Sequence, residues 1–293
     1  FYNNFSYNFI TILLIYFFST LFVIFLYSLF DIRLLDAFSL SFTTISSGGF
    51  LPSENLSSIT STDLQVLVLG VTLLIPIFNF YLFFNIFTKR FAFKKHQEDI
   101  HLFIIIITLT LLFYFLVTFD VKFSDIFLSI TSSLSTSGIS TFSPTVDLSL
   151  FFVFLTIIGG SLISTSSGFK YIRFYILLKI SYQEIYRVVK PINVFDKNLF
   201  NEESKIDDDD SKIAFLVFIL FIISIFVLSS ILSLDNLTFE NAFKLSILTL
   251  TNTTTSSLYG FDNLIFSDLN SFSKVSLIGF MILGKVEFIS LLY

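Results

Sequence analysis

Long runs of apolar residues dominate the chain and alternate with short polar segments. A helix needs about 20 consecutive apolar residues to cross the hydrocarbon core of a bilayer. Six runs qualify, and the fourth is overlong and contains a Gly/Ser-rich interruption; they cover about residues 7–30, 63–87, 100–119, 148–185, 213–234 and 272–293. The pattern predicts an all-α polytopic membrane protein.

A shorter apolar segment lies in each of three loops between these runs and passes directly into a cluster of Ser, Thr and Gly. The three segments occupy residues 35–50, 124–139 and 239–258. Each apolar part is too short to cross a bilayer, so the repeated unit is predicted to be span, half-helix, loop, span. Gly49 and Gly138 hold matched positions in two units. Ser257 is aligned with them in the third, where a shifted register would use Gly260.

A half-helix that enters a membrane and returns as extended chain leaves backbone carbonyls unpaired. Such groups are tolerated at that depth where they line a water-filled or ion-filled cavity, and they can replace the hydration shell of a cation. Ordinary Ser/Thr-rich outer loops are the alternative, which the threefold repetition disfavours. The predicted ion-binding residues are Ser46, Ser47, Gly48, Gly49, Ser135, Thr136, Ser137, Gly138, Thr254, Thr255, Ser256 and Ser257.

Composition narrows the class of function. The chain is 54% hydrophobic and 13% charged, so lipid is its expected surroundings and nucleic acid is not an expected partner. It has no Cys, which excludes disulfides and thiolate metal sites. His96 and His101 have no companion ligands, so they are predicted to be solvated or interfacial. No phosphate-binding fingerprint is present. The sequence therefore predicts neither an enzyme nor a resident cofactor.

The basic residues orient the chain. Lys and Arg concentrate in residues 89–95 and 187–212, which the positive-inside rule places in the cytoplasm. This assignment leaves Arg33, Lys122, Lys244 and Lys274 toward the opposite side. The three half-helices are then expected to enter the membrane from outside.

Four motifs resemble the Trk/Ktr/HKT superfamily of potassium transporters. Ser46–Phe50 and Ser135–Ile139 are similar to its second and third filter loops. Gly159–Arg173 follows the family pattern Gly-Gly-x-x-Gly-Ser-Thr-x-Gly-Gly-hydrophobic-Lys-x-x-Arg, with Ile163 and Ser167 where Gly is common. Leu283–Glu287 resembles the Leu-Gly-Arg-hydrophobic-Glu signature of the last span, with Lys in place of Arg.

The resemblance implies a TrkH-like pore subunit built from repeats around one pore, with the first of the family's four repeats absent from this sequence. Residues 1–97 would be repeat 2, residues 98–186 repeat 3, residues 187–212 a cytoplasmic connector and residues 213–293 repeat 4. Within repeat 3, residues 159–168 would form an intramembrane gate loop. The implied gate residues are Gly159, Gly160, Ser164, Thr165, Gly168 and Lys285.

Alternatives stay open for both gate elements. The Gly/Ser-rich segment could be a helix-packing seam. Lys285 could pair with Glu287 or extend to the cytoplasmic surface instead of projecting under the filter. Lys170 and Arg173 are expected to neutralise the inner helix end or face lipid headgroups.

The function implied by the resemblance is translocation of monovalent cations across a plasma membrane, expected to be a bacterial inner membrane. Potassium is the implied cargo, and sodium is the alternative because plant members with Ser at one filter position are associated with sodium transport. A homodimer and a nucleotide-binding regulatory subunit similar to TrkA or KtrA are the implied partners, with Lys190–Pro191 similar to a family element of the connector. Two further alternatives are a secondary transporter of a small solute, which interrupted spans in corresponding positions would favour, and a non-transporting assembly protein.

Overall fold

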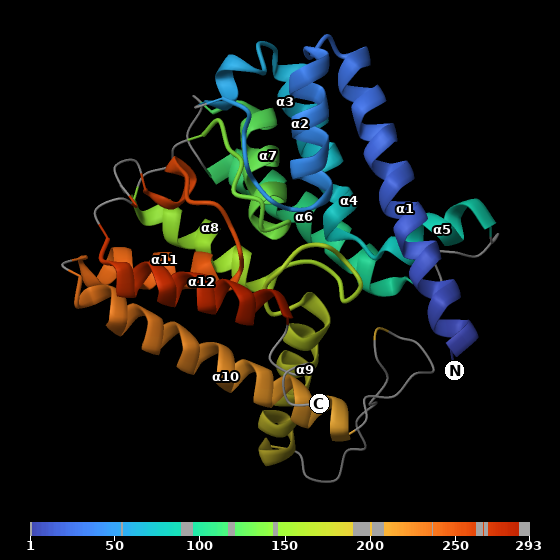
Figure 1. The fold of residues 1–293 in the computed structure, drawn as a ribbon. Helices are drawn as coiled ribbons and strands as arrows, with labels where there is room; N and C mark the ends of the chain where they lie inside the picture. The colour runs from blue at the N-terminus through green and yellow to red at the C-terminus, as the bar shows by residue number, and fades with distance from the viewer. Residues whose placement is uncertain are drawn as a thin grey trace.

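The structure is a computed structural model. It describes residues 2–53, 55–88, 96–116, 121–142, 146–189, 200, 208–235, 237–261, 266 and 269–286. Throughout these residues the chain forms helices joined by turns and loops, without a strand (Figure 1). The predicted all-α architecture is confirmed.

The first part of the chain folds as a long helix, a half-helix and a broken helix. Helix α1 covers Tyr2–Leu29, and α2, Leu34–Ile45, returns beside it after a tight turn (Figure 1). A short 3₁₀ turn, Leu56–Ser58, leads to α3, Asp63–Thr72. Thr62 and Gln65 form a capping box that fixes the start of α3. The hydroxyl groups of Tyr27 on α1 and Thr72 on α3 lie 2.6 Å apart and join the two helices inside the protein.

The remaining helices repeat this plan twice. The second unit contains α6 (Gln97–Leu116), the half-helix α7 (Phe123–Leu134), α8 (Val146–Ile158) and α9 (Tyr171–Val189). The third contains α10 (Asp208–Ser233), the half-helix α11 (Phe239–Leu250), a 3₁₀ turn at Ser257–Tyr259 and α12 (Ser271–Val286). The three half-helices have the same length and lie between the longer helices.

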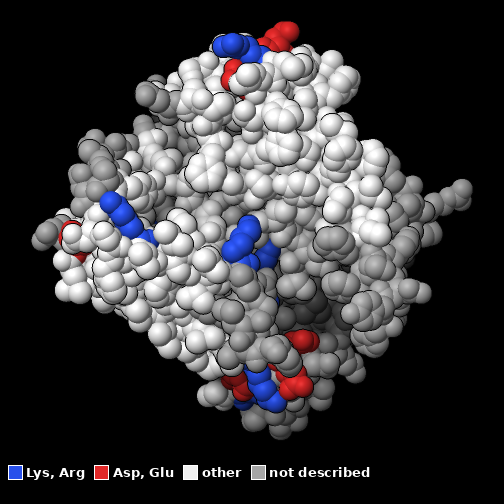
Figure 2. Space-filling model, in the orientation of Figure 1, with Lys and Arg blue, Asp and Glu red and all other residues white. Residues whose placement is uncertain are grey.

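The buried and exposed residues are distributed as expected for a protein in lipid. Half-helix α7 is almost entirely buried, whereas α1 exposes large apolar side chains, among them Phe18 and Phe25. The face of the molecule in Figure 2 is mostly uncharged, with acidic and basic side chains toward its upper, lower and left edges and a small basic patch near its centre. Among the described residues, three helices are long and apolar enough to cross a membrane unaided: Ile10–Leu29, Gln97–Leu116 and Asp209–Ser233.

Two of the predicted spans are interrupted, whereas the sequence indicated only one. The expected interruption of the fourth run separates α8 from α9. The second run is also broken, because α3 gives way to the short helix α4, Leu74–Ile77, and α5, Phe80–Thr88, starts beyond an extended Phe78. Figure 1 shows α5 turned away from the direction of α3 and α4. The signal was present in Pro76 and Asn79, a helix breaker followed by a helix-capping residue.

A second expectation is wrong. His96 is 8% exposed rather than solvated, and its Nδ1 lies 3.3 Å from a carboxylate oxygen of Asp99. Its Nε2 lies 2.9 Å from the amide nitrogen of Asn85. His101 packs edge to face against Phe200. Tertiary packing over the start of α6 buries His96, which the local sequence does not indicate, whereas the half-buried His101 agrees with the expected interfacial position.

Helix α12 provides a matched test of close helix packing. A β-carbon on Gly284 would lie 2.0 Å from the carbonyl oxygen of Leu250 at the end of α11, whereas one on Gly279 would meet nothing within 4 Å. Gly284→Ala should therefore lower stability by about 1–3 kcal/mol through overpacking. Gly279→Ala should be neutral or stabilise by up to about 1 kcal/mol, because Ala favours helix. Thermal unfolding in detergent measures both changes, and equal effects would show that α12 does not rest on Leu250.

Candidate ion pathway

The three half-helices end in the same turn. After the last residue of each, a non-glycine residue adopts a positive φ: 55° at Ser47, 59° at Thr136 and 51° at Asn252. The next residue donates its amide hydrogen to the carbonyl five residues back: Gly48 to Thr43 at 2.9 Å, Ser137 to Ser132 at 3.0 Å, and Thr253 to Leu248 at 2.8 Å. Such strained turns are maintained by the surrounding structure and concentrate at functional sites.

These bonds establish the register of the third loop and correct the sequence alignment. The counterparts of Ser46–Gly49 and Ser135–Gly138 are residues 251–254, so Thr254 holds the position of Gly49 and Gly138. Ser257, which was aligned there, instead begins a 3₁₀ turn, and Gly260 ends that turn with φ 78°. The alignment failed because no glycine marks this position in the third loop, and the half-helix end that determines the register is a tertiary feature.

The three loops lie against one another in chain order. A β-carbon on Gly49 would lie 1.7 Å from the carbonyl oxygen of Ser137, and one on Gly138 would lie 2.5 Å from that of Thr254. Only glycine allows this approach. The Thr254 hydroxyl donates to the Ser137 carbonyl at 2.6 Å. The three candidate loops are therefore brought together at one place, although at least 86 positions (Gly49 to Ser135) separate one loop from the next in the sequence.

A cavity of about 870 Å³ adjoins these loops. Its lining includes all four candidate residues of the first loop, Gly138 of the second, residues 254–257 of the third, and Lys285 of α12. Ser135, Thr136 and Ser137 are not part of this lining, and their side chains are buried behind it. Hydroxyl and main-chain groups from three repeats therefore line part of the cavity, and apolar side chains, among them Leu245, Leu248 and Phe261, line the rest.

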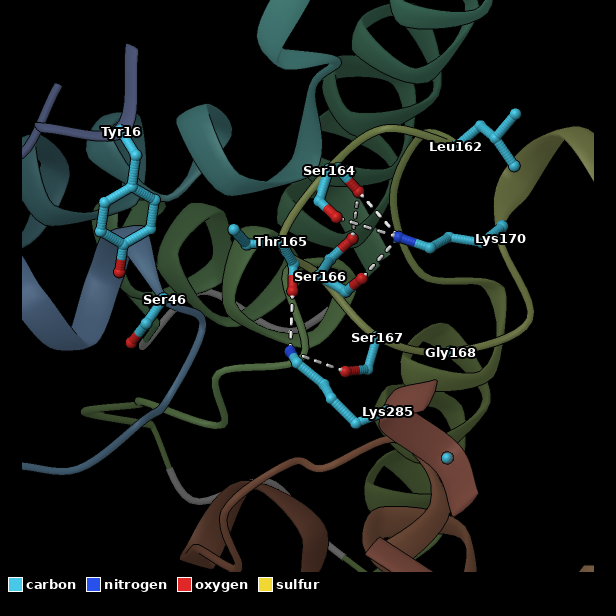
Figure 3. A pocket seen from close by; sticks show the side chains of 11 residues that line it. Tyr16, Ser46, Leu162, Ser164, Thr165, Ser166, Ser167, Gly168, Lys170 and Lys285 are labelled. Carbon is cyan, nitrogen blue, oxygen red and sulfur yellow. Dashed lines mark hydrogen bonds between the residues drawn. The ribbon is translucent and has the colours of Figure 1, made fainter. Parts of the chain in front are cut away.

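The segment between α8 and α9 lies beside the half-helix ends. Residues 159–170 are non-helical, and Gly159 and Gly168 have φ values of 67° and 91°. A second cavity, of about 360 Å³, is lined by Leu162, residues 164–168, Lys170 and Lys285 together with Tyr16 and Ser46 (Figure 3).

Side chains join this segment to the half-helix ends. The Thr165 hydroxyl donates to the carbonyl of Ile45, the last residue of α2, at 2.7 Å. The Ser167 amide donates to the Thr136 hydroxyl at 2.9 Å. Lys285 donates to the Thr165 carbonyl at 3.0 Å and to the Ser167 hydroxyl at 3.2 Å (Figure 3). The segment, two half-helix ends and α12 therefore form one connected polar structure.

Comparison with known proteins identifies the family. The family model for the cation transport protein TrkH matches residues 122–293, more than half of the chain. The chain belongs to the TrkH family. The crystal structure of the potassium transporter TrkH from Vibrio parahaemolyticus is similar over 93% of this chain, with a TM-score of 0.84 and 25% sequence identity. An uncharacterized cation transporter of Methanocaldococcus jannaschii is 26% identical over 221 residues, 74% of this chain.

The match confirms the resemblance drawn from the motifs and establishes a multi-pass plasma-membrane protein of a transporter family, not an enzyme. The chain spans 45% of the length of the Methanocaldococcus protein and 60% of that of the crystallised transporter.

Lys170 differs from its expected position in this TrkH-family chain. It is 5% exposed and points back into the Gly/Ser-rich segment instead of toward lipid headgroups. Its ammonium group donates to the Ser166 carbonyl at 2.7 Å and to the carbonyl and hydroxyl of Ser164 at 3.2 and 3.1 Å (Figure 3). A buried ammonium group needs such partners, and a carbonyl-rich loop offers them. The sequence pattern predicted the position of Lys170 along the chain but not the direction in which its side chain points.

The structure describes one set of contacts for Lys285, whose side chain had three alternative positions in the sequence analysis. Its contacts with Thr165 and Ser167 place it beside the segment. Glu287, its alternative partner, lies outside the described residues, as do Lys190–Pro191 and most of the predicted connector.

Removing the Lys170 ammonium group should loosen the segment. Lys170→Met leaves the Ser164 and Ser166 carbonyls without this donor, at a cost of about 1–3 kcal/mol for each unsatisfied group. Lys212→Met, at a 75% exposed side chain on α10, is the matched control and should change stability by less than about 1 kcal/mol. Thermal unfolding in detergent compares the two, and equal melting temperatures would contradict the anchoring role of Lys170.

Proposed function

We propose that this chain forms most of the pathway of a potassium uptake system. The observation that carries the proposal is the convergence of the three loops that follow the half-helices on one cavity, to whose lining each contributes hydroxyl or main-chain groups. The carboxyl end of a helix carries about half a unit of negative charge from its aligned peptide dipoles. Three such ends near one cavity favour a cation over an anion, and adjacent carbonyl groups can replace its water.

The proposed filter comprises Ser46–Gly49, Ser135–Gly138 and residues 251–254, the structural counterpart of the first two loops. Thr255, Ser256 and Ser257, which the sequence alignment also included, continue the lining of the cavity. The close approach of Gly49 to the Ser137 carbonyl supports this assignment. Potassium is the proposed cargo because the TrkH protein of the similar crystal structure is a potassium transporter.

The proposed gate is the segment 159–168 with Lys285. The segment lies against two half-helix ends. Both contacts there involve a hydroxyl group, that of Thr165 or that of Thr136, and hydroxyl groups exchange hydrogen-bond partners readily. In a low-dielectric passage the Lys285 charge raises the free energy of a nearby cation. Charge and segment together would obstruct the pathway in the conformation that the structure describes.

Assembly is also proposed from the family relationship. Repeats 2, 3 and 4 would correspond to residues 1–97, 98–186 and 213–293. The partners proposed are a second copy of the chain and a cytoplasmic nucleotide-binding regulatory subunit.

Potassium uptake by a bacterium that lacks its own uptake systems tests the function. The complete gene product that contains this chain should restore growth on low potassium and accumulate potassium in preference to sodium. Gly138→Ala should reduce uptake at least tenfold, since its β-carbon would lie 2.5 Å from the Thr254 carbonyl oxygen. Gly279→Ala on α12 is the control, because a β-carbon there would meet nothing within 4 Å.

Membrane levels of both variants are measured by immunoblot. Uptake of neither cation by the unaltered protein would refute the function. Normal uptake by Gly138→Ala would refute the filter assignment and leave the function in place.

Lys285 provides a separate test of the gate. Lys285→Met removes the donor to Thr165 and Ser167 together with the positive charge, so the uptake rate should rise by about three- to tenfold. Lys285→Arg keeps the charge and donor groups and should remain within about twofold of the unaltered protein. Initial rates at saturating potassium measure the effect. A fall in rate with Lys285→Met at an unchanged membrane level would contradict the proposed barrier.

A further inference from the structure

The two helix breaks of the chain lie side by side and satisfy one another's backbone groups. The Ser161 amide donates to the Ile77 carbonyl at 2.8 Å, and the Phe80 amide donates to the Ile163 carbonyl at 3.0 Å. In an unbroken helix the Ile77 carbonyl would accept from the residue four positions later, and the Phe80 amide would donate to Pro76. The Gly/Ser-rich segment thus replaces the bonds that the second span gives up.

The first turn of α6 completes this junction. A Glu98 carboxylate oxygen accepts from the Leu162 amide at 3.2 Å. A carboxylate oxygen of the neighbouring Asp99 accepts from the Asn79 amide at 2.9 Å. Glu98 therefore binds the break between α8 and α9, and the adjacent Asp99 binds the break between α4 and α5. Neither break has enough partners of its own, and unsatisfied backbone groups at membrane depth are costly.

The rest of the segment is held differently. Residues 160–163, the anchored arm, are joined to the second span by main-chain bonds and to Glu98. Residues 164–168, the gate tip, keep a single, longer main-chain bond to the second span, from the Ser166 amide to the Pro76 carbonyl at 3.2 Å. Their other contacts, with Ile45, Thr136, Lys170 and Lys285, are made mostly through hydroxyl and ammonium groups. The gate tip also lines the smaller cavity (Figure 3), where water or a passing ion can replace these partners.

We infer that residues 76–80 of the broken second span and Glu98 are working parts of the gate: they hold the anchored arm still while the gate tip moves. The inference rests on the proposed gate and goes beyond it, because it divides the segment into a fixed and a moving part. It also assigns Glu98 as a positioning residue, acting on the pathway through the Leu162 amide.

Reversible cross-links distinguish a fixed arm from a moving one. The chain has no Cys, so introduced pairs are its only thiols. Phe80→Cys with Ile163→Cys joins the arm to the second span, where a backbone bond brings the two residues within the roughly 4.4–6.8 Å Cα separation that a disulfide needs. Ser47→Cys with Thr165→Cys joins the gate tip to the filter loop, where the two hydroxyl oxygens lie 3.4 Å apart. Potassium uptake is measured before and after oxidation and again after reduction.

The fixed arm predicts uptake within about twofold of the reduced state for the oxidised 80–163 pair. For the oxidised 47–165 pair it predicts at least a tenfold loss that reduction reverses. Each protein is its own control, so packing changes caused by the substitutions cancel. If the 80–163 disulfide reversibly blocks potassium uptake, the inference of a fixed arm is overturned, whereas the proposed gate stands. Unchanged uptake with both disulfides removes the gate itself, and the inference with it.

A second measurement does not depend on disulfide formation. In a Ser164→Cys background, Glu98→Leu should increase the labelling rate of the single thiol by about threefold or more, because the Leu162 amide loses its partner. Glu98→Gln keeps an acceptor oxygen and should label at the background rate. Glu184→Leu, at a 61% exposed carboxylate on α9, is the matched control. Equal labelling rates for Glu98→Leu and Glu184→Leu overturn the role of Glu98.

Discussion

A backbone N–H or C=O group inside a bilayer must find its partner within the protein or in a cavity that the protein maintains, and the ion pathway proposed for this chain depends on that constraint. Three half-helix ends and two helix breaks lie at its centre. The breaks satisfy one another through the bonds of Ser161 and Phe80 to the facing segment. The half-helix ends satisfy part of their groups through tight turns and expose the remainder to the cavity. Irregular chain is therefore confined to the places where ions or moving parts are proposed.

Backbone strain at the half-helix ends is repeated with different side chains. Ser47, Thr136 and Asn252 all adopt a conformation that disfavours L residues, and a bond to the carbonyl five residues back follows each. Because three different residue types adopt the same geometry, the packing of neighbouring residues determines this turn and the side chain at the positive-φ position does not. Thr254 extends this point, since it occupies a position that is glycine in the two other loops and uses its hydroxyl to hold the Ser137 carbonyl. The third loop is thus tied to its neighbour through a side chain.

Positive charge inside the protein or beside the cavities is the second unusual feature of a pathway proposed for cations. Lys170 donates to loop carbonyls, and Lys285 bridges the same loop to the last helix. Lys244, which the orientation argument placed toward the outer side, is 2% exposed and pairs with Glu240 at 2.7 Å. It also donates to Ser149 on α8 at 3.1 Å. The ammonium groups of Lys170 and Lys244 are costly to bury and are compensated by nearby oxygen atoms. Lys170 and Lys285 hold the Gly/Ser-rich segment, whereas Lys244 joins α11 to α8.

The amino-acid sequence determined the features that depend on local composition and periodicity. Apolar runs indicated the spans, the shorter runs before Ser46 and Ser135 indicated the half-helices, and the glycines at 159 and 168 indicated a break. Tertiary structure decided the rest. The register of the third loop follows from the way a half-helix ends, and the pairing of the two helix breaks follows from hydrogen bonds between residues that are distant in sequence. In a membrane such bonds are enforced because water offers no substitute, and no local pattern of residues records which distant group will supply the partner.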